Sequence, residues 1–169
     1  MAVDQELYQL AERVGRALQA HGWLFATAES CTGGWIAEAM TAVPGSSAWF
    51  DRGFITYSNT AKQELLGVPA ATLDAHGAVS EATVLAMADG ALAHSPAQIV
   101  VAVSGIAGPD GGSRTRPVGT VWLAWAQRGG ASAAQCRHFD GDRDSVRRQT
   151  VLAALHGVLE RLDGAVLVG

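Results

Sequence analysis

Three residues of this 169-residue chain are of types that together can activate a hydroxyl group: Ser30, Tyr57 and Lys62. Ser30 lies in Glu-Ser-Cys-Thr-Gly-Gly, where small residues would leave a hydroxyl exposed at a turn and amide N–H groups available to an oxyanion. Lys62 is the only lysine among twelve lysine and arginine side chains. A neutral amine can act as a general base, whereas a guanidinium cannot, because its pKa exceeds about 12. With no histidine beside the serine, we predict a Ser–Lys pair bridged by the Tyr57 hydroxyl.

Each of these residues also has a purely structural interpretation. Ser30 or Thr32 could cap the helix that follows, and Lys62 could be a solvated lysine on a short helix. We expect Lys62 in the first turn of a helix capped by Asn59 or Thr60, where the helix dipole and partial burial would both lower the lysine pKa. That position favours a general base, but the sequence leaves both interpretations open.

Two glycine-rich segments could let a ligand approach the backbone closely. One is the turn after Ser30, and the other is the loop 104–119, which follows the most apolar predicted strand and holds five glycines. A long glycine loop after a strand is more often a ligand loop than a passive connection. It fits neither a P-loop nor G-x-G-x-x-G, so we infer neither ATP nor a dinucleotide cofactor. The predicted binding residues in these segments are Thr32, Gly33, Gly34, Ser104, Gly105 and Gly108.

Arg143 and Arg147 are spaced four residues apart near the predicted start of the last helix. Side chains at this spacing share a helix face, and two guanidinium groups near a helix N-terminus could hold a phosphate. Asp142 and Asp144 lie beside them, so a solvated charge network is the alternative. His76 and Cys31 are weaker candidates, interpreted as a loop histidine and a small buried thiol.

The elements that would position these residues alternate between helix and strand, which predicts an α/β fold with a mixed, mostly parallel sheet covered by helices on both faces, an α/β/α sandwich. Gly22 should end the first helix, and Ser80 should start a long one. We expect helices at 3–20, 35–40, 59–67, 80–94 and 142–162, strands at 23–28, 52–58 and 97–103, and a hairpin of 120–127 with 132–139.

Composition limits the classes of partner. A formal net charge of −4 offers no general attraction to nucleic acid or to an anionic membrane surface. The acidic, polar N-terminal segment and the lack of a long apolar run predict an untargeted cytoplasmic protein. Two cysteines and no metal-ligand spacing among the five histidines predict neither a disulfide framework nor a metal site.

Five stretches together resemble the CinA C-terminal domain family of nicotinamide-nucleotide amidases, over roughly residues 5–160 and in the same order. They are TAESCTGGWIAEAMT, GSSAWFDRGFITYSNTAKQELLGV, HGAVSE, VSGIAGPDGGSRTRPVGTVWLAWA and FDGDRDSVRRQ. The resemblance implies an α/β sandwich fold and one amidase domain over residues 1–169. It also implies hydrolysis of the carboxamide of nicotinamide mononucleotide (NMN) to nicotinate mononucleotide and ammonia, in pyridine-nucleotide salvage.

The resemblance also assigns roles by position. It places the family nucleophile on Ser30 and its partners on Tyr57 and Lys62, with no cofactor and no metal, in a stand-alone form that is a homo-oligomer. Backbone N–H groups would hold the tetrahedral oxyanion. Two alternatives stay open: a catalytically weak nucleotide-binding or competence- and damage-associated interaction module, and an amidase or esterase for another small substrate.

Overall fold

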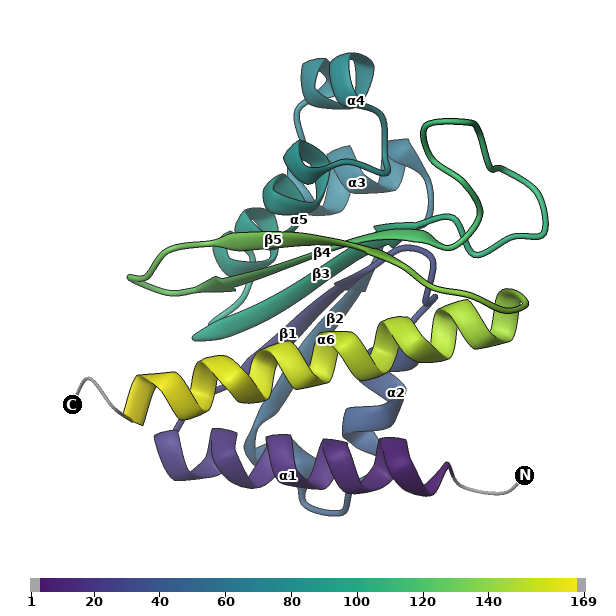
Figure 1. Ribbon diagram of the computed structural model, residues 1–169. Helices are drawn as coiled ribbons and strands as arrows, with labels where there is room; N and C mark the ends of the chain where they lie inside the picture. The colour runs from purple at the N-terminus through teal and green to yellow at the C-terminus, as the bar shows by residue number, and fades with distance from the viewer. Residues whose placement is uncertain (1–3, 167–169) are drawn as a thin grey trace.

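The computed structural model describes residues 4–166 of the chain. Five strands form one sheet in the order β2-β1-β3-β4-β5, with helices on both faces (Figure 1). In chain order the elements are α1 Gln5–His21, β1 Phe25–Glu29, α2 Trp35–Thr41, the 3-10 helix η1 Ser46–Ala48, β2 Phe50–Ile55, α3 Asn59–Leu66, α4 Ala70–His76, α5 Glu81–Ala93, β3 Ile99–Gly105, β4 Thr120–Gln127, β5 Ala133–His138 and α6 Arg143–Val166.

The direction of the strands brings the candidate segments to one edge of the sheet. β1 pairs in parallel with both β2 and β3, so these three strands end at the same edge. β4 runs antiparallel to β3 and to β5, and it therefore starts at that edge, where β5 ends and α6 begins. The sheet is mixed, and β1, β2, β3 and β5 point in one direction, as predicted. Ligands of open α/β sheets bind at such a carboxyl edge.

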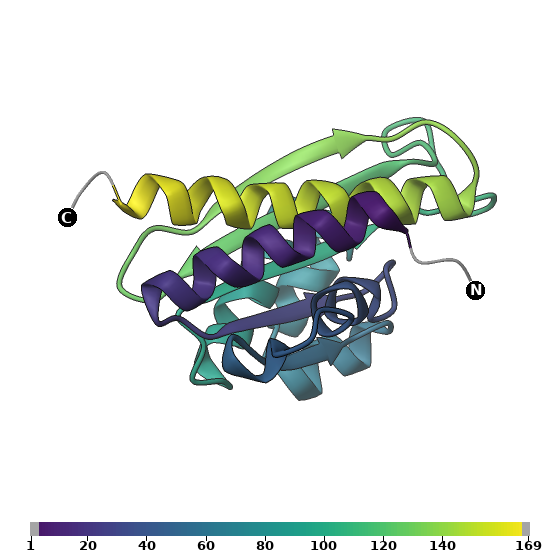
Figure 2. The ribbon, with the colours of Figure 1, turned by 90° about the horizontal axis from the view of Figure 1, so that it is seen from below.

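Both faces of the sheet carry apolar side chains, and β3 shows why. Val101 and Val103 of β3 pack into a core with α1, α2 and α6, whereas Val100 and Ala102 pack on the opposite face with α3, α4 and α5. Successive side chains of a strand point to opposite faces, so an uninterrupted apolar strand needs a cover on both. Figure 2 shows α1 and α6 running alongside each other under the first face.

Several predicted helix boundaries are confirmed. Gly22 ends α1 at φ 65°, as predicted, whereas the predicted helix start at residue 3 lies outside the described residues. Within them α1 begins at Gln5, where the Asp4 carboxylate accepts from the Leu7 amide at 3.2 Å. Ser80 starts α5, where its hydroxyl accepts from the Thr83 amide. No helix within residues 4–166 is both long and apolar enough to cross a membrane.

Other boundaries differ from the prediction around Lys62. β2 ends at Ile55, so Tyr57 follows the strand instead of belonging to it. Ser58, not Asn59 or Thr60, caps α3, because its hydroxyl accepts from the Ala61 amide at 3.0 Å. Lys62 is consequently the fourth residue of α3, at the end of the first turn.

The sequence did not predict α4, and its local signals explain why. The helix has seven residues, starts after Pro69 without a side-chain cap and places only Leu73 in the core. So short a helix has little periodicity to detect. His76, interpreted as a loop residue, is instead its last residue.

Candidate active site

The turn between β1 and α2 presents Ser30 at the carboxyl edge of the sheet. The Ser30 amide donates to Val103 O at 3.2 Å, which ties the turn to the end of β3, and the Ser30 side chain is largely buried at 8% exposure. Gly33 and Gly34 have φ values of 60° and 103°, a conformation that glycine adopts without strain. These two glycines let the chain reverse from strand to helix within five residues.

The helix-capping interpretation of Ser30 and Thr32 is wrong. The N-cap of α2 is Gly34, with no side-chain hydrogen bond, and the Thr32 hydroxyl donates to Glu29 Oε1 at 2.7 Å. The first amides of α2 are satisfied by the Glu29 carboxylate, which accepts from Ile36 N at 2.9 Å and Ala37 N at 3.0 Å. The serine hydroxyl is therefore not used as a cap.

Glu29 is a structural residue of the site that the sequence reasoning missed. Its side chain is fully buried, and it accepts a fourth hydrogen bond from the Thr27 hydroxyl at 3.1 Å. A carboxylate at a helix N-terminus is favoured by the dipole and by the unpaired amides there. A lone glutamate at the end of an otherwise uncharged apolar strand was the signal available in the sequence.

Lys62 reaches the nucleophile turn from α3. Its Nζ atom lies 3.1 Å from Ser30 Oγ and donates to Thr56 O at 2.8 Å, and the side chain is only 1% exposed. The solvated-lysine interpretation is therefore wrong. Within residues 4–166, no carboxylate forms an ion pair with this amine. Burial lowers the Lys62 pKa below its ordinary 10.5, against a smaller opposing effect of the Cys31 thiol.

Tyr57 does not bridge the serine and the lysine. Its side chain is 63% exposed, and its hydroxyl accepts from Arg143 Nη2 at 3.2 Å. Because Ser30 and Lys62 are already in direct hydrogen-bond contact, there is no gap between them for a phenol to span. Tyr57 nevertheless lines the same cavity as both residues. The loop position of Tyr57, two residues past β2, allows its ring to turn outward.

The cavity above Ser30 has a volume of about 290 Å³ and is lined by residues that follow β1 and β2, by the end of β3 and the loop after it, and by residues of α3 and α6. The end of β3 supplies Ser104 and Gly105, which were predicted to lie in the loop, and the loop itself supplies Gly108. A Cβ at Gly105 would lie 2.6 Å from a Val121 methyl group and 2.9 Å from Thr120 O, so the end of β3 packs too closely against β4 for a side chain there.

The two arginines of α6 line different cavities. Arg143 lines the Ser30 cavity and donates to Gly108 O at 2.9 Å, so it joins the glycine loop to Tyr57. Arg147 lies behind the nucleophile turn and faces a second cavity of about 590 Å³, together with Thr32, Gly33 and Gly34. Those four residues were predicted to bind substrate, and the structure places them outside the lining of the cavity that holds Ser30 and Lys62.

The nucleophile turn offers backbone donors to a developing negative charge. Within residues 4–166, the amides of Cys31, Thr32 and Gly34 donate no hydrogen bond, whereas those of Ser30, Gly33 and Trp35 all do. Cys31 also lines the cavity, and burial raises the pKa of its thiol to about 11, so the thiol stays protonated and unreactive beside the serine. Cys31 is thus a small buried group, as interpreted.

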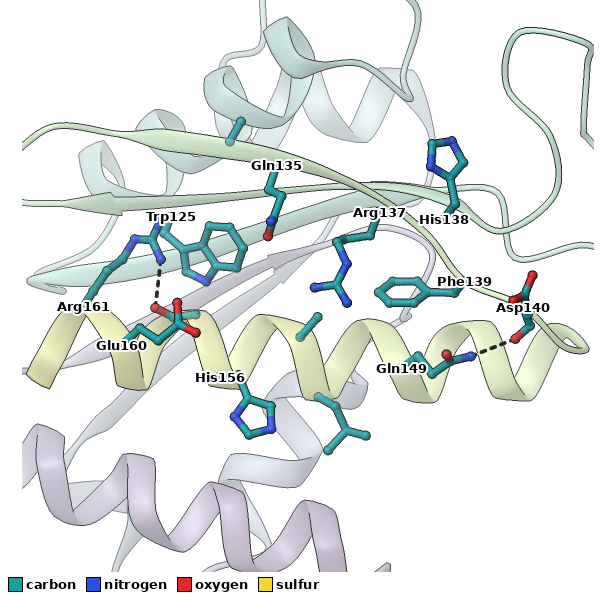
Figure 3. A pocket seen from close by; sticks show the side chains of 14 residues that line it. Trp125, Gln135, Arg137, His138, Phe139, Asp140, Gln149, His156, Glu160 and Arg161 are labelled. Atoms are coloured by element: carbon teal, nitrogen blue, oxygen red, sulfur yellow. Dashed lines mark hydrogen bonds between the residues drawn. The ribbon is translucent and has the colours of Figure 1, made fainter.

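A third and larger cavity, of about 780 Å³, lies between β5 and α6 (Figure 3). It holds none of the predicted site residues. Gln135 and Arg137 of β5 point towards α6 there, and Gln149 donates to Asp140 O at 2.8 Å. Within the described part of the chain, no group of three or more His, Cys, Asp or Glu side chains is arranged to hold a metal ion.

Comparison with known proteins decides the family. The family model of the CinA C-terminal domain matches residues 7–162. The chain belongs to the CinA C-terminal domain family. It is 57% identical over 152 residues to the nicotinamide-nucleotide amidohydrolase PncC of Escherichia coli (strain K12), covering 90% of this chain and 92% of that protein. To the enzyme of the same name from Pseudomonas putida it is 58% identical over 151 residues, covering 89% and 94%.

The fold agrees with solved structures of the CinA superfamily. A crystal structure of a competence-damaged protein (CinA) superfamily protein from Klebsiella pneumoniae 700603 matches with a TM-score of 0.91 and 45% identity, covering 95% of this chain and 99% of that one. The predicted fold class and the resemblance to the family are therefore confirmed. In this CinA C-terminal domain, a serine and a buried amine meet in one cavity, beside turn amides that have no acceptor within residues 4–166, a set of groups suited to nucleophilic acyl transfer.

Proposed function

We propose that this chain hydrolyses the carboxamide of NMN to nicotinate mononucleotide and ammonia. The observation that carries the proposal is the 3.1 Å contact between Ser30 Oγ and a Lys62 amine that is 1% exposed. It is supported by relatives more than half identical to this chain that are named nicotinamide-nucleotide amidohydrolases. The product acid would return to pyridine-nucleotide synthesis.

The first half of the reaction is acylation of Ser30. Lys62, whose pKa is lowered by burial, takes the hydroxyl proton in its neutral form as Oγ attacks the carboxamide carbon. The oxyanion of the tetrahedral intermediate accepts from backbone amides of the turn, where the amides of Cys31 and Thr32 follow Ser30 and have no acceptor within residues 4–166. When the carbon–nitrogen bond breaks, the Lys62 ammonium returns its proton to the leaving NH₂ group, which departs as ammonia.

The second half is hydrolysis of the ester. A water molecule loses a proton to Lys62 as it attacks the ester carbon, and Ser30 Oγ then leaves and recovers that proton. The products are the carboxylic acid and free enzyme, so one water is consumed for each ammonia released. Both halves use the same amine, first as base and then as acid.

Recognition of the mononucleotide falls to groups at the rim of the cavity. Arg143 is the arginine that lines it, and a guanidinium pairs well with a phosphate. The exposed ring of Tyr57, held by Arg143, offers an aromatic face to the positively charged pyridinium ring of NMN. In this proposal Tyr57 acts on the substrate rather than on the proton of Ser30.

An ammonia-release assay tests the function. The wild-type chain is incubated with NMN, nicotinamide riboside and nicotinamide, beside Ser30→Ala and a control, Ser132→Ala, whose hydroxyl bonds Asp89 at 3.1 Å on the surface. We expect release from NMN in the wild type and the control only, with little from the two substrates that lack a phosphate. A Ser30→Ala chain with wild-type turnover would overturn the proposal. A wild type that binds NMN without turnover would favour the binding-module alternative.

A further inference from the structure

Arg147 lies on the outer side of the nucleophile turn and not in the Ser30 cavity, where its predicted role in phosphate binding would place it. Its guanidinium donates through Nε to Cys31 O and through Nη2 to Thr32 O, both at 3.1 Å. Its central carbon lies 5.3 Å from the centre of the Trp35 ring, in the first turn of α2. One side chain of α6 thus contacts the turn and the helix that follows it.

These contacts fix the orientation of peptide groups that the reaction needs. A trans peptide is planar, so the N–H of each residue points opposite to the preceding carbonyl. Arg147 draws Cys31 O outward, and the Thr32 N–H is consequently directed away from the guanidinium. It draws Thr32 O outward as well, and the Gly33 N–H points inward to Ser30 O at 3.1 Å. The guanidinium therefore sets the planes of two consecutive peptides beside the nucleophile.

Little else holds the outer side of this turn. Thr32 O also accepts from the Trp35 amide at 3.1 Å, but within residues 4–166 Cys31 O accepts only from Arg147. Gly33 and Gly34 add backbone freedom at the same place. The inner side is held by the Glu29 carboxylate. The turn is consequently held on its inner side by the Glu29 carboxylate and on its outer side by the Arg147 guanidinium. Of these two side chains, only Arg147 belongs to α6.

The charge on Arg147 adds to its geometric effect. A hydrogen bond from a cation to a peptide carbonyl polarises that peptide and strengthens its N–H as a donor. The Cys31–Thr32 peptide is polarised in this way, and the Thr32 amide is one of three turn amides with no acceptor in the described residues. Arg147 is half-buried with its side chain 27% exposed, so water competes only partly for its hydrogen bonds.

We propose that Arg147 is a positioning residue for acyl transfer at Ser30: it orients the Cys31–Thr32 peptide and so the backbone donors beside the nucleophile, without touching the substrate. This inference rests on the proposed function of the site. It assigns Arg147 a role different from phosphate binding, because its guanidinium is engaged behind the turn and does not line the Ser30 cavity.

The test compares Arg147→Gln, Arg147→Lys and a matched control, Arg148→Gln. Arg148 is the next residue on α6 and forms ion pairs with Asp4 at 2.6 Å and with Glu6 at 2.7 Å. Neither partner belongs to the nucleophile turn. Turnover of NMN gives kcat and KM, thermal unfolding gives the fraction folded, and a fluorophosphonate that labels nucleophilic serines gives the reactivity of Ser30 without NMN.

We expect Arg147→Gln to lower kcat by about 10- to 100-fold with KM little changed, the size typical of a misplaced catalytic geometry. The labelling rate of Ser30 should fall in parallel, Arg147→Lys should recover part of both rates, and Arg148→Gln should keep both while losing stability. Free guanidinium ion at millimolar concentration should partly restore an Arg147→Ala chain.

Three outcomes would overturn the inference. They are an Arg147→Gln chain with wild-type kcat, a rise in KM alone, or a loss of activity no greater than the loss of folded protein. If the wild type labels at Ser30 but does not hydrolyse NMN, the proposed function fails while the labelling rates still decide the role of Arg147. A wild type that neither labels nor hydrolyses would overturn both.

Discussion

Replacing Lys62 with methionine tests two effects of the buried amine, one on the rate of catalysis and one on the stability of the fold. The side chains are similar in length, and Lys62 is 1% exposed, so methionine fills the site without a solvent-facing group. Loss of a general base costs about 10²- to 10⁴-fold in rate, which is about 2.7–5.4 kcal/mol of transition-state stabilisation. We expect the rate of ammonia release from NMN to fall at least that far in Lys62→Met, since the same amine serves both halves of the reaction.

The effect on stability has a sign that depends on pH. Methionine removes two hydrogen bonds, to Thr56 O and Ser30 Oγ, worth about 1 kcal/mol each. It also removes the cost of burying a cation, which the lowered pKa of Lys62 expresses. Between its folded-state pKa and 10.5, the unfolded chain binds more protons at Lys62 than the folded chain. Wild-type stability should therefore rise relative to Lys62→Met as pH increases through that window.

Urea unfolding of both chains at several pH values measures this difference, beside the ammonia assay at one pH. A Lys62→Met chain that retains more than half of the wild-type rate would refute the role of the amine as base. A stability difference that moves in the opposite direction with pH would refute the lowered pKa. Lys62→Arg is less informative, because a larger and permanently charged group cannot be buried there without disruption.

Three further predictions concern Lys62 and the turn that carries Ser30. The rate kcat/KM for NMN should rise with pH through a midpoint below 10.5, since burial lowers the pKa of Lys62 and its neutral form is the active one; a midpoint at or above 10.5 would count against this. Glu29→Gln should lower the free energy of unfolding by about 3 kcal/mol in chemical denaturation, because an amide cannot accept all four hydrogen bonds, and an unchanged value would contradict the capping role. At pH 8, iodoacetamide should modify Cys136 before Cys31 in a peptide-mapping experiment, because burial raises the Cys31 pKa to about 11; equal rates would contradict its burial.

Sequence patterns predicted most of the fold because each element carried its own signal. The apolar stripe of α1 with Gly22 after it and the hairpin of β4 with β5 occur where expected, and the apolar run of β3 forms a strand shifted two residues towards the C-terminus, to Ile99–Gly105. Their order then determined that three parallel strands end at one edge, which brought Ser30 and Lys62 together across 32 residues of chain. Short elements with weak caps, such as α4, lack such signals.

The details that the sequence missed all depend on side-chain direction in three dimensions. The spacing of Arg143 and Arg147 predicted a shared phosphate site, but Arg143 lines the Ser30 cavity whereas Arg147 contacts the nucleophile turn from a second cavity. The bridge by Tyr57 was predicted from residue types alone, and the direct contact of Lys62 with Ser30 leaves no place for it. The assignment of substrate ligands and the homo-oligomer implied by the family both stay predictions.

The most direct test of the central claim is partition of the acyl-enzyme between water and hydroxylamine. The wild-type chain is given NMN with increasing hydroxylamine, and ammonia, nicotinate mononucleotide and the corresponding hydroxamate are all quantified. We predict that the hydroxamate forms at the expense of the acid while ammonia release does not fall, and that Ser30→Ala and Lys62→Met form neither product. Ammonia release without any hydroxamate, or undiminished in Ser30→Ala, would contradict a covalent intermediate on Ser30.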